Sequence, residues 1–260
     1  MMLFQPSLCD ETLARAKQAF DSRSFAVAAT EFEDAVRICP AKAPILISLG
    51  QTQYLLGDEQ GAERSLRQAI ALNPKDTAGR YALGRIYYQQ NRFPEAVAQL
   101  KQVVELDPKH YRGWDNLGLC YDALQQDQDA LRSFFRALDL VKDEHREYDW
   151  AYGNLADFFL KRNEFEKAFQ LAAEAASRNP QSARNFFLTG KALTKLERNE
   201  TSLRWLRRAV ELDAGYADAH YLLGRTLRKL GQEEEARAHL ETFRKLKATA
   251  ASRSGSSAQR

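Results

Sequence analysis

The chain has 260 residues, of which 28% are charged and 44% hydrophobic, and its formal net charge at pH 7 is +3. This balance gives no argument by itself for a nucleic-acid-binding protein, because such proteins concentrate positive charge. No apolar run approaches the roughly 18 residues that a membrane-spanning helix needs.

The first eight residues, MMLFQPSL, form an N-terminal segment before the regular part of the chain. They carry no basic leader, and Pro6 interrupts them, so they do not have the pattern of a signal peptide. The three cysteines, Cys9, Cys39 and Cys120, are odd in number and far apart, which predicts reduced thiols and neither a disulfide framework nor a metal site. We therefore expect a cytoplasmic protein, or a periplasmic or secreted one if an upstream signal sequence is missing from this chain.

The clearest stretch is 77–109, TAGRYALGRIYYQQNRFPEAVAQLKQVVELDPK, which reads as two amphipathic helices joined by a short turn. Asn91 lies in the turn and tolerates a left-handed backbone, while Pro94 suits the start of a helix. Asp107 and Pro108 then predict the end of the second helix. The stretch predicts a helical hairpin.

The same plan recurs with a period of 34 residues. Pro40, Pro74 and Pro108 keep this spacing, as do the Leu-Gly pairs that end at Gly50, Gly84 and Gly118 and the alanines Ala28, Ala62, Ala96 and Ala130. A period of 34 is typical of a helix–turn–helix repeat. The fourth copy is the most complete, with Trp114, Leu117, Gly118, Tyr121, Ala130, Phe134 and Ala137.

These residues resemble the pattern of the tetratricopeptide repeat family, and the resemblance covers most of the chain. It implies an all-α fold, a right-handed superhelical solenoid of antiparallel helix pairs. It also implies that first helices line an inner, concave face and second helices an outer face, and that the protein is an interaction scaffold.

We count seven copies, at about 9–42, 43–76, 77–110, 111–144, 149–182, 183–216 and 217–247. The first is degenerate, with Arg15 and Ala16 where other copies have Leu-Gly. The phase slips by four residues at 141–149, which we interpret as an extension of the preceding helix by about a turn or, alternatively, as a joint between two blocks. Residues 248–260 are small and polar, and their composition predicts a disordered tail.

Glycines at 50, 84, 118, 190 and 224 fall in the middle of predicted helices, where each costs about 1 kcal/mol relative to alanine. We expect a partner helix to pack closely against them, with Ala62, Ala96, Ala130 and Ala236 on the opposite side of the contact. A larger residue at Gly118 would then overpack the interface.

The phase of the repeat, together with the inner face that the resemblance implies, gives candidate groove residues on the first helices. Aromatic rings beside arginine and amide groups suit an extended peptide or a partner helix, although several of these side chains also fit a packing or solvated role. The candidates are Tyr54, Tyr81, Arg85, Tyr88, Arg112, Asn116, Asn154, Asp157, Phe187, Lys191, Tyr221 and Arg225.

One use of this family is a carboxylate clamp for the C-terminal tails of chaperones, which needs a set of Lys, Asn and Arg on three consecutive first helices. Asn154 and Arg184 come nearest, but Asp115 and Leu119 occupy positions that need Lys and Asn. The sequence argues against the clamp.

Other functions remain open from the sequence. From residue 182 onwards the chain has sixteen Lys or Arg and nine Asp or Glu. An RNA-binding role of this basic half is therefore an alternative, although nucleic acid is the less expected partner. Arg204, Arg207 and Arg208 fall on a second helix, away from the expected groove. The array is also a candidate targeting subunit of an enzyme complex, and self-association is possible because Leu240, Phe243 and Leu246 lack a distinct capping helix.

Catalytic chemistry has no sequence support. The four histidines, at 110, 145, 220 and 239, show no metal-ligand spacing, and no HExxH, P-loop or GxSxG motif occurs. We expect no enzyme activity, no cofactor and no metal, and a protein or peptide partner whose identity the sequence does not give.

Overall fold

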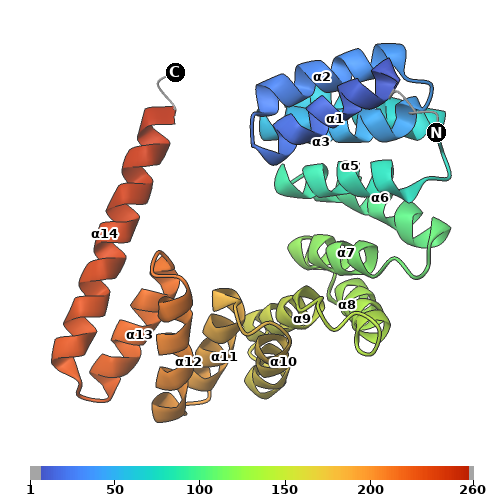
Figure 1. Ribbon diagram of the computed structural model, residues 1–260. Coiled ribbons are helices and arrows are strands. Elements are labelled where there is room, and N and C mark those ends of the chain that lie inside the picture. The colour runs from blue at the N-terminus through green and yellow to red at the C-terminus, as the bar shows by residue number, and fades with distance from the viewer. Residues whose placement is uncertain (1–6, 258–260) are drawn as a thin grey trace, which may run out of the picture. The chain divides into compact units, whose positions relative to one another are not determined.

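The computed structural model describes residues 7–257, with side chains to 252, and this part of the chain folds into fourteen helices and no strand. They divide into two compact units, Met1–Ala137 and Leu138–Arg260, each of which we describe by itself. In chain order the helices are α1 (Leu8–Asp21), α2 (Phe25–Ile38), α3 (Lys42–Leu55), α4 (Glu59–Leu72), α5 (Thr77–Gln89), α6 (Phe93–Leu106), α7 (Tyr111–Ala123), α8 (Asp127–Val141), α9 (Trp150–Lys161), α10 (Phe165–Arg178), α11 (Ala183–Lys195), α12 (Asn199–Leu212), α13 (Ala217–Lys229) and α14 (Glu233–Ser257) (Figure 1).

Helices pack in consecutive antiparallel pairs, and each pair stacks on the next within its unit (Figure 1). Odd-numbered helices also contact one another, α3 with α5 and α5 with α7 in the first unit, and α9 with α11 and α11 with α13 in the second. The first helices of successive pairs therefore lie side by side and form one face of each unit. The predicted class, an all-α solenoid of helix pairs, is confirmed.

The turn inside each pair has a residue with positive φ at the same place in all seven pairs. These residues are Arg23, Gly57, Asn91, Gln125, Asn163, Glu197 and Gly231. Glycine and asparagine tolerate this left-handed conformation best, as expected for Asn91. The recurrence shows that the turn geometry belongs to the repeat and overrides the local residue preference at Arg23, Gln125 and Glu197.

The mid-helix glycines make the close contacts that their cost in helix stability requires. A Cβ added at Gly84 would lie 2.9 Å from Leu100 Cγ, and one added at Gly118 would lie 2.6 Å from the ring of Phe134. The equivalent glycines 50, 190 and 224 meet Leu66, Leu206 and Leu240 in the same way. The nearest atoms belong to these large side chains, whereas the predicted partners Ala62, Ala96 and Ala236 contribute backbone carbonyls behind them.

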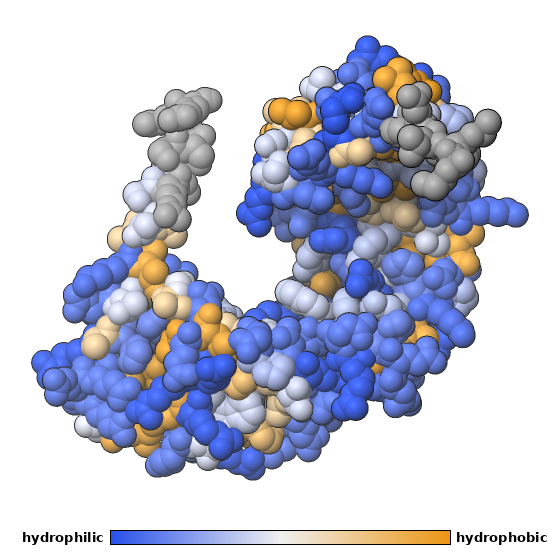
Figure 2. Space-filling model, in the orientation of Figure 1, coloured by the Kyte–Doolittle hydropathy of each residue, from blue (hydrophilic) through white to orange (hydrophobic). Residues whose placement is uncertain are grey.

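Apolar side chains are mostly enclosed between helices. Hydrophilic residues cover most of the visible face, and apolar residues appear in separate patches (Figure 2). Fully buried side chains such as Leu83, Leu100, Leu155 and Leu206 recur at the repeat spacing. Leu83 and Leu100 share one core cluster with Ala62 of the preceding pair and Leu117 of the following pair. Neighbour stacking thus supplies the burial that one hairpin cannot provide alone.

Glu63 on α4 holds together an ion-pair network with α5 and the following turn. Its carboxylate accepts hydrogen bonds from Tyr87 Oη at 2.8 Å, Arg67 Nε at 2.9 Å and Arg92 Nη1 at 2.9 Å. The guanidinium of Arg92 also lies over the Tyr87 ring, 4.1 Å from its centroid. Partial burial raises the pKa of Glu63, but the bonds from Arg92, Tyr87 and Arg67 outweigh it and lower the pKa to about 2.

We expect this network to make the first unit sensitive to acid. A carboxyl pKa lowered from 4.5 to about 2 contributes stability that is complete above pH 4.5 and lost as the pH falls towards 2. Glu63→Gln should therefore cost about 1–2 kcal/mol at pH 7, after allowance for solvent screening, and much less at pH 2–3. Urea unfolding of the wild type, Glu63→Gln and the exposed control Glu33→Gln at both pH values measures this; an equal loss at both would contradict it.

The break in the repeat phase is not the helical extension that we expected. α8 ends at Val141, and residues 142–149 form turns before α9 begins at Trp150. Arg178 of α10 binds the C-terminal end of α8. Its guanidinium donates hydrogen bonds to the carbonyls of Val141 at 3.3 Å and Lys142 at 3.0 Å and to Tyr152 Oη at 2.8 Å. A side chain 37 residues away thus donates to carbonyls at the end of α8, although the Val141 carbonyl also accepts the His145 N–H at 3.3 Å.

Two further expectations differ from the structure. Cys9 and Cys39 form a disulfide between the first turn of α1 and the C-cap of α2, so these two thiols are not free, whereas Cys120 is free and buried. α14 continues to Ser257, through residues 248–257 that we expected to be disordered. Ala248, Ala250 and Ala251 favour the helix more than the polar composition disfavours it. Residues 258–260 lie outside the described part.

Candidate functional site

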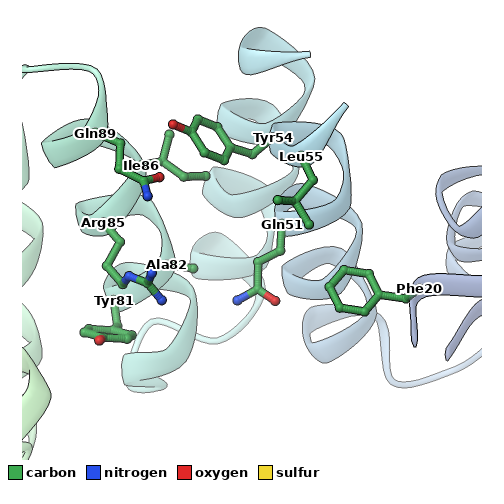
Figure 3. Close-up of a pocket in the computed structure, with 9 residues that line it drawn as sticks. All are labelled: Phe20, Gln51, Tyr54, Leu55, Tyr81, Ala82, Arg85, Ile86 and Gln89. Carbon is green, nitrogen blue, oxygen red and sulfur yellow. The ribbon is translucent and has the colours of Figure 1, made fainter. Parts of the chain in front are cut away.

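A cavity of about 280 Å³ opens on the face formed by the first helices of the first unit (Figure 3). α1 contributes Phe20, and α3 and α5 contribute the other walls: Gln51, Tyr54, Leu55, Tyr81, Ala82, Arg85, Ile86 and Gln89. A second cavity of about 180 Å³ lies beside it and shares Phe20 and Gln51 as a common wall. We call the two together the α1–α3–α5 trough.

Tyr81 is held in place at the edge of the first cavity. Its hydroxyl oxygen accepts a hydrogen bond from Asn116 Nδ2 at 3.3 Å, and its ring lies 5.0 Å from the ring of His110. Burial raises the pKa of Tyr81 and lowers the pKa of His110, so both rings are neutral near pH 7. A neutral His110 accepts the Gly113 N–H at 2.9 Å and caps α7, which fixes the ring against which Tyr81 packs.

Arg85 is the one charged residue that lines the first cavity. Its guanidinium lies 5.8 Å from the centroid of the Tyr81 ring, and Figure 3 shows Arg85 and Gln51 extending towards each other. The cavity thus combines apolar walls with one cation and with the two amides of Gln51 and Gln89. Such a surface can enclose an apolar side chain and bind polar groups next to it.

The structure brings together some of the predicted groove residues of this unit and separates others. Tyr54, Tyr81 and Arg85 line the first cavity, and Asn116 acts through Tyr81. Tyr88 instead packs on Phe93, with ring centroids 5.6 Å apart, and Arg112 lies 5.5 Å from the centroid of the Tyr111 ring. Tyr88 and Arg112 are therefore not part of the cavity wall.

Sequence reasoning missed Phe20, Gln51 and Gln89, although the repeat contains a signal for the first two. Gln51 precedes Arg85 by one period, and Phe20 precedes Tyr54 by one period. Extending the alignment into the degenerate first copy would have added Phe20. Accepting an uncharged residue at the position of Arg85 would have added Gln51.

The predicted residues of the second unit form a separate group on α9, α11 and α13. Arg184 Nη2 donates to Asn154 Oδ1 at 3.0 Å, and the guanidinium lies 5.2 Å from the centroid of the Trp150 ring, which is half exposed. Asp157 is taken up in an ion pair with Lys161 at 3.0 Å. Much of the polarity of this group is therefore satisfied internally.

Aromatic pairs occupy the rest of that face. Phe187 packs on Tyr216 with ring centroids 4.9 Å apart, and burial raises the pKa of Tyr216 to about 12. Lys191 lies 5.9 Å from the Phe187 centroid. Further along, Tyr221 packs on Phe243 at 4.9 Å and Arg225 lies 5.7 Å from the Tyr221 centroid. Trp150 and Tyr216 belong to this group and were not predicted.

Two histidines meet in the structure although they are distant in the sequence. Nδ1 of His220 and Nδ1 of His239 are 2.9 Å apart, and Nε2 of His220 lies 3.2 Å from the Ala214 carbonyl. Across residues 7–257 no three His, Cys, Asp or Glu side chains come together as metal ligands. The same part of the chain has no helix of the length and apolarity needed to cross a membrane.

The basic outer helix α12 is largely neutralised by neighbouring carboxylates. Arg207 pairs with Glu235 at 2.9 Å and Arg208 with Glu211 at 3.2 Å, while Arg204 lies 5.5 Å from the centroid of the Trp205 ring. An open depression lies beside these residues, with Phe186 and Leu203 in its lining. Two of the three arginines thus have their charge compensated within the chain.

The chain belongs to the tetratricopeptide repeat family. Sequence profiles described as tetratricopeptide or TPR repeats match residues 13–77, 53–118, 114–146, 190–231 and 217–248. No curated protein matches the chain in sequence.

Solved structures of this family share the fold at low sequence identity. A tetratricopeptide repeat protein from Parabacteroides merdae aligns with a TM-score of 0.70 at 16% identity and covers 92% of this chain and 93% of its own. PilF from Pseudomonas aeruginosa aligns with a TM-score of 0.67 at 21% identity, covering 81% and 94%. YrrB, described as a TPR protein with an unusual peptide-binding site, aligns with a TM-score of 0.54 at 21% identity, covering 70% and 91%. These likenesses establish the fold.

Proposed function

We propose that this protein is an interaction scaffold that binds a segment of a partner protein in the α1–α3–α5 trough. The fold supports the general role, because stacked helix pairs present a preformed face to a partner. The single observation that carries the specific proposal is the first cavity, where Tyr54, Tyr81 and Phe20 leave an opening of about 280 Å³ beside Arg85.

The geometry favours binding by complementarity between rigid surfaces. Tyr81 is fixed by Asn116 and His110, and its neighbour Ala82 is buried in the contact between helix pairs. Side chains that are ordered before binding lose little conformational entropy when the partner arrives. A role as the targeting subunit of an enzyme complex is one form of the same activity, in which the bound partner is an enzyme.

The RNA-binding alternative has less support. Its basic helix α12 has Arg207 and Arg208 in ion pairs with Glu235 and Glu211, so binding phosphate would require these pairs to break. Absence of a salt-dependent mobility shift with single-stranded RNA at low ionic strength would dismiss it.

A charge-reversed variant tests the proposed trough together with Arg112 of α7, which lies outside the cavity wall but whose charge acts on Tyr81. Arg85→Glu/Arg112→Glu should keep the circular dichroism spectrum and melting temperature of the wild type yet capture roughly tenfold less of the partner from native extract. The matched control is Arg64→Glu/Lys101→Glu, which makes the same charge change at exposed positions of the second helices α4 and α6. Equal capture by both double variants would remove the trough from consideration.

The compartment is a separate proposal. The Cys9–Cys39 disulfide supports a location where disulfides persist, such as the periplasm or the exterior, in preference to the reducing cytoplasm expected from the sequence. Alkylation of free thiols in freshly lysed native cells, followed by mass spectrometry, tests it: Cys9 and Cys39 should be protected, and their modification would restore the cytoplasmic expectation.

A further inference from the structure

We infer that the trough selects an extended segment in which a glutamate or aspartate lies two residues away from a bulky apolar side chain. This inference rests on the proposed function and specifies the chemistry of the occupant. Three features of the trough carry it: the charge on its wall, the position of a free amide, and the shape of the opening.

The charge on the wall of the first cavity has one sign. Arg85 lines it, and no Asp or Glu does. Arg85 makes no ion pair with any carboxylate in residues 7–252, and its contact is with the Tyr81 ring at 5.8 Å. Placing a carboxylate here would form a charge-assisted hydrogen bond in a half-enclosed setting, whereas a lysine of the occupant would be repelled.

Gln51 stands between the two cavities and lines both. Its side-chain amide has no hydrogen-bond partner within the described residues, and Figure 3 shows it pointing into the opening from α3. An amide offers a donor and an acceptor, which matches the N–H and C=O groups of an extended backbone. A helix has already used most of these groups internally, so Gln51 favours an extended occupant over a helical one.

The size of the first cavity limits the apolar side chain of the occupant that can enter it. About 280 Å³ bounded by Tyr54, Leu55, Tyr81 and Ile86 encloses one large apolar side chain and leaves no room for a folded domain. The second cavity, of about 180 Å³, lies on the other side of Phe20 and carries Lys17 and Asp21 on its wall. Because successive side chains of an extended chain point in opposite directions, residues two apart lie on the same side, so an apolar side chain can enter the first cavity while a carboxylate two residues away reaches Arg85.

Synthetic peptides give a direct test. The probes are heptapeptides with blocked termini and the same fluorescein label, so that they differ only in their side chains. Each has a central Leu or Phe, and Glu, Gln or Lys two residues away on either side. Fluorescence anisotropy should show Glu-containing peptides binding roughly tenfold more tightly than their Gln counterparts, and Lys-containing peptides more weakly still. The Arg85→Glu variant should reverse the order, whereas the exposed control Arg64→Glu should keep it.

The possible outcomes distinguish a failure of this inference from a failure of the proposed function on which it rests. A wild type without preference for Glu, or an Arg85→Glu variant that keeps the wild-type order, overturns the inference. If such peptides bind without charge preference and Tyr81→Ala abolishes their binding, the trough remains a docking site and only its acidic specificity is wrong. If no peptide binds, the inference falls; if capture by Arg85→Glu/Arg112→Glu also equals that of its control, the proposed function falls with it.

Discussion

Replacing Gly118 by leucine is expected to destabilise the fourth helix pair by about 3 kcal/mol or more. A Cβ alone would lie 2.6 Å from Phe134 Cδ1 and 2.7 Å from Cε1, and the Phe134 ring is completely buried. A leucine adds three further carbons to this overlap, so either the ring leaves its position or α7 and α8 separate. The gain in helix propensity over glycine, about 1 kcal/mol, is too small to offset the clash.

The measurement must resolve individual repeats, because a solenoid need not unfold as one unit. Hydrogen exchange by mass spectrometry should show lost protection in α7 and α8, with a lower thermal midpoint for the first unit. Ala98→Leu places the same side chain at an exposed position of α6 and should change neither quantity. A Gly118→Leu protein with the exchange pattern and melting temperature of the wild type would refute the packing described here.

Reduction of the Cys9–Cys39 disulfide is expected to weaken the first helix pair by about 3–4 kcal/mol. The cysteines are 30 residues apart, and a cross-link that closes a loop of this length removes a comparable amount of chain entropy from the unfolded state. Among the described residues, the helix contacts of α1 are chiefly with α2, with Ala16, Ala19 and Phe32 in the core that the two helices share. Loss of the cross-link should therefore let α1 exchange with solvent well before α5 or α6.

Thermal melts and hydrogen exchange with and without a reductant measure this effect. The Cys9→Ser/Cys39→Ser protein should match the reduced wild type and should not respond to the reductant, which separates the disulfide from any action on buried Cys120. Because Phe20 of α1 forms a wall of both cavities, peptide affinity of the trough should fall in parallel. Unchanged protection of α1 after reduction would contradict the expectation.

The repeat unit itself was predictable because its signals are local and recur in phase. Proline, Leu-Gly and alanine positions 34 residues apart placed the helix pairs, and Asn91 and Pro94 placed the turn between α5 and α6. The prolines and Asn91 act on backbone within one turn of their own positions, whereas the Leu-Gly positions act through packing inside one helix pair. Because the pattern occurs seven times, a degenerate copy such as the first can still be recognised from its position relative to the others.

What the sequence did not give depends on contacts between distant side chains. Cys9 and Cys39 meet because α1 and α2 are antiparallel and their opposite ends coincide, which an odd cysteine count argued against. Tyr54 and Tyr88 occupy equivalent positions, yet Tyr54 lines the cavity while Tyr88 is held by Phe93, so phase alone does not separate a lining residue from a packing residue. Arg178 reaches the end of α8 across 37 residues, where the sequence pattern favoured more helix.

The reach of Arg178 determines where the chain can be divided for study of its second half. A fragment beginning at α9 would start at residue 150 and would lack the carbonyls of Val141 and Lys142. The Arg178 side chain is 6% exposed in the whole chain, and truncation would leave it only Glu174 and Tyr152 as side-chain acceptors, without the two carbonyls, which is unfavourable. A truncation boundary before Leu138 keeps both acceptors and should yield the better-behaved protein.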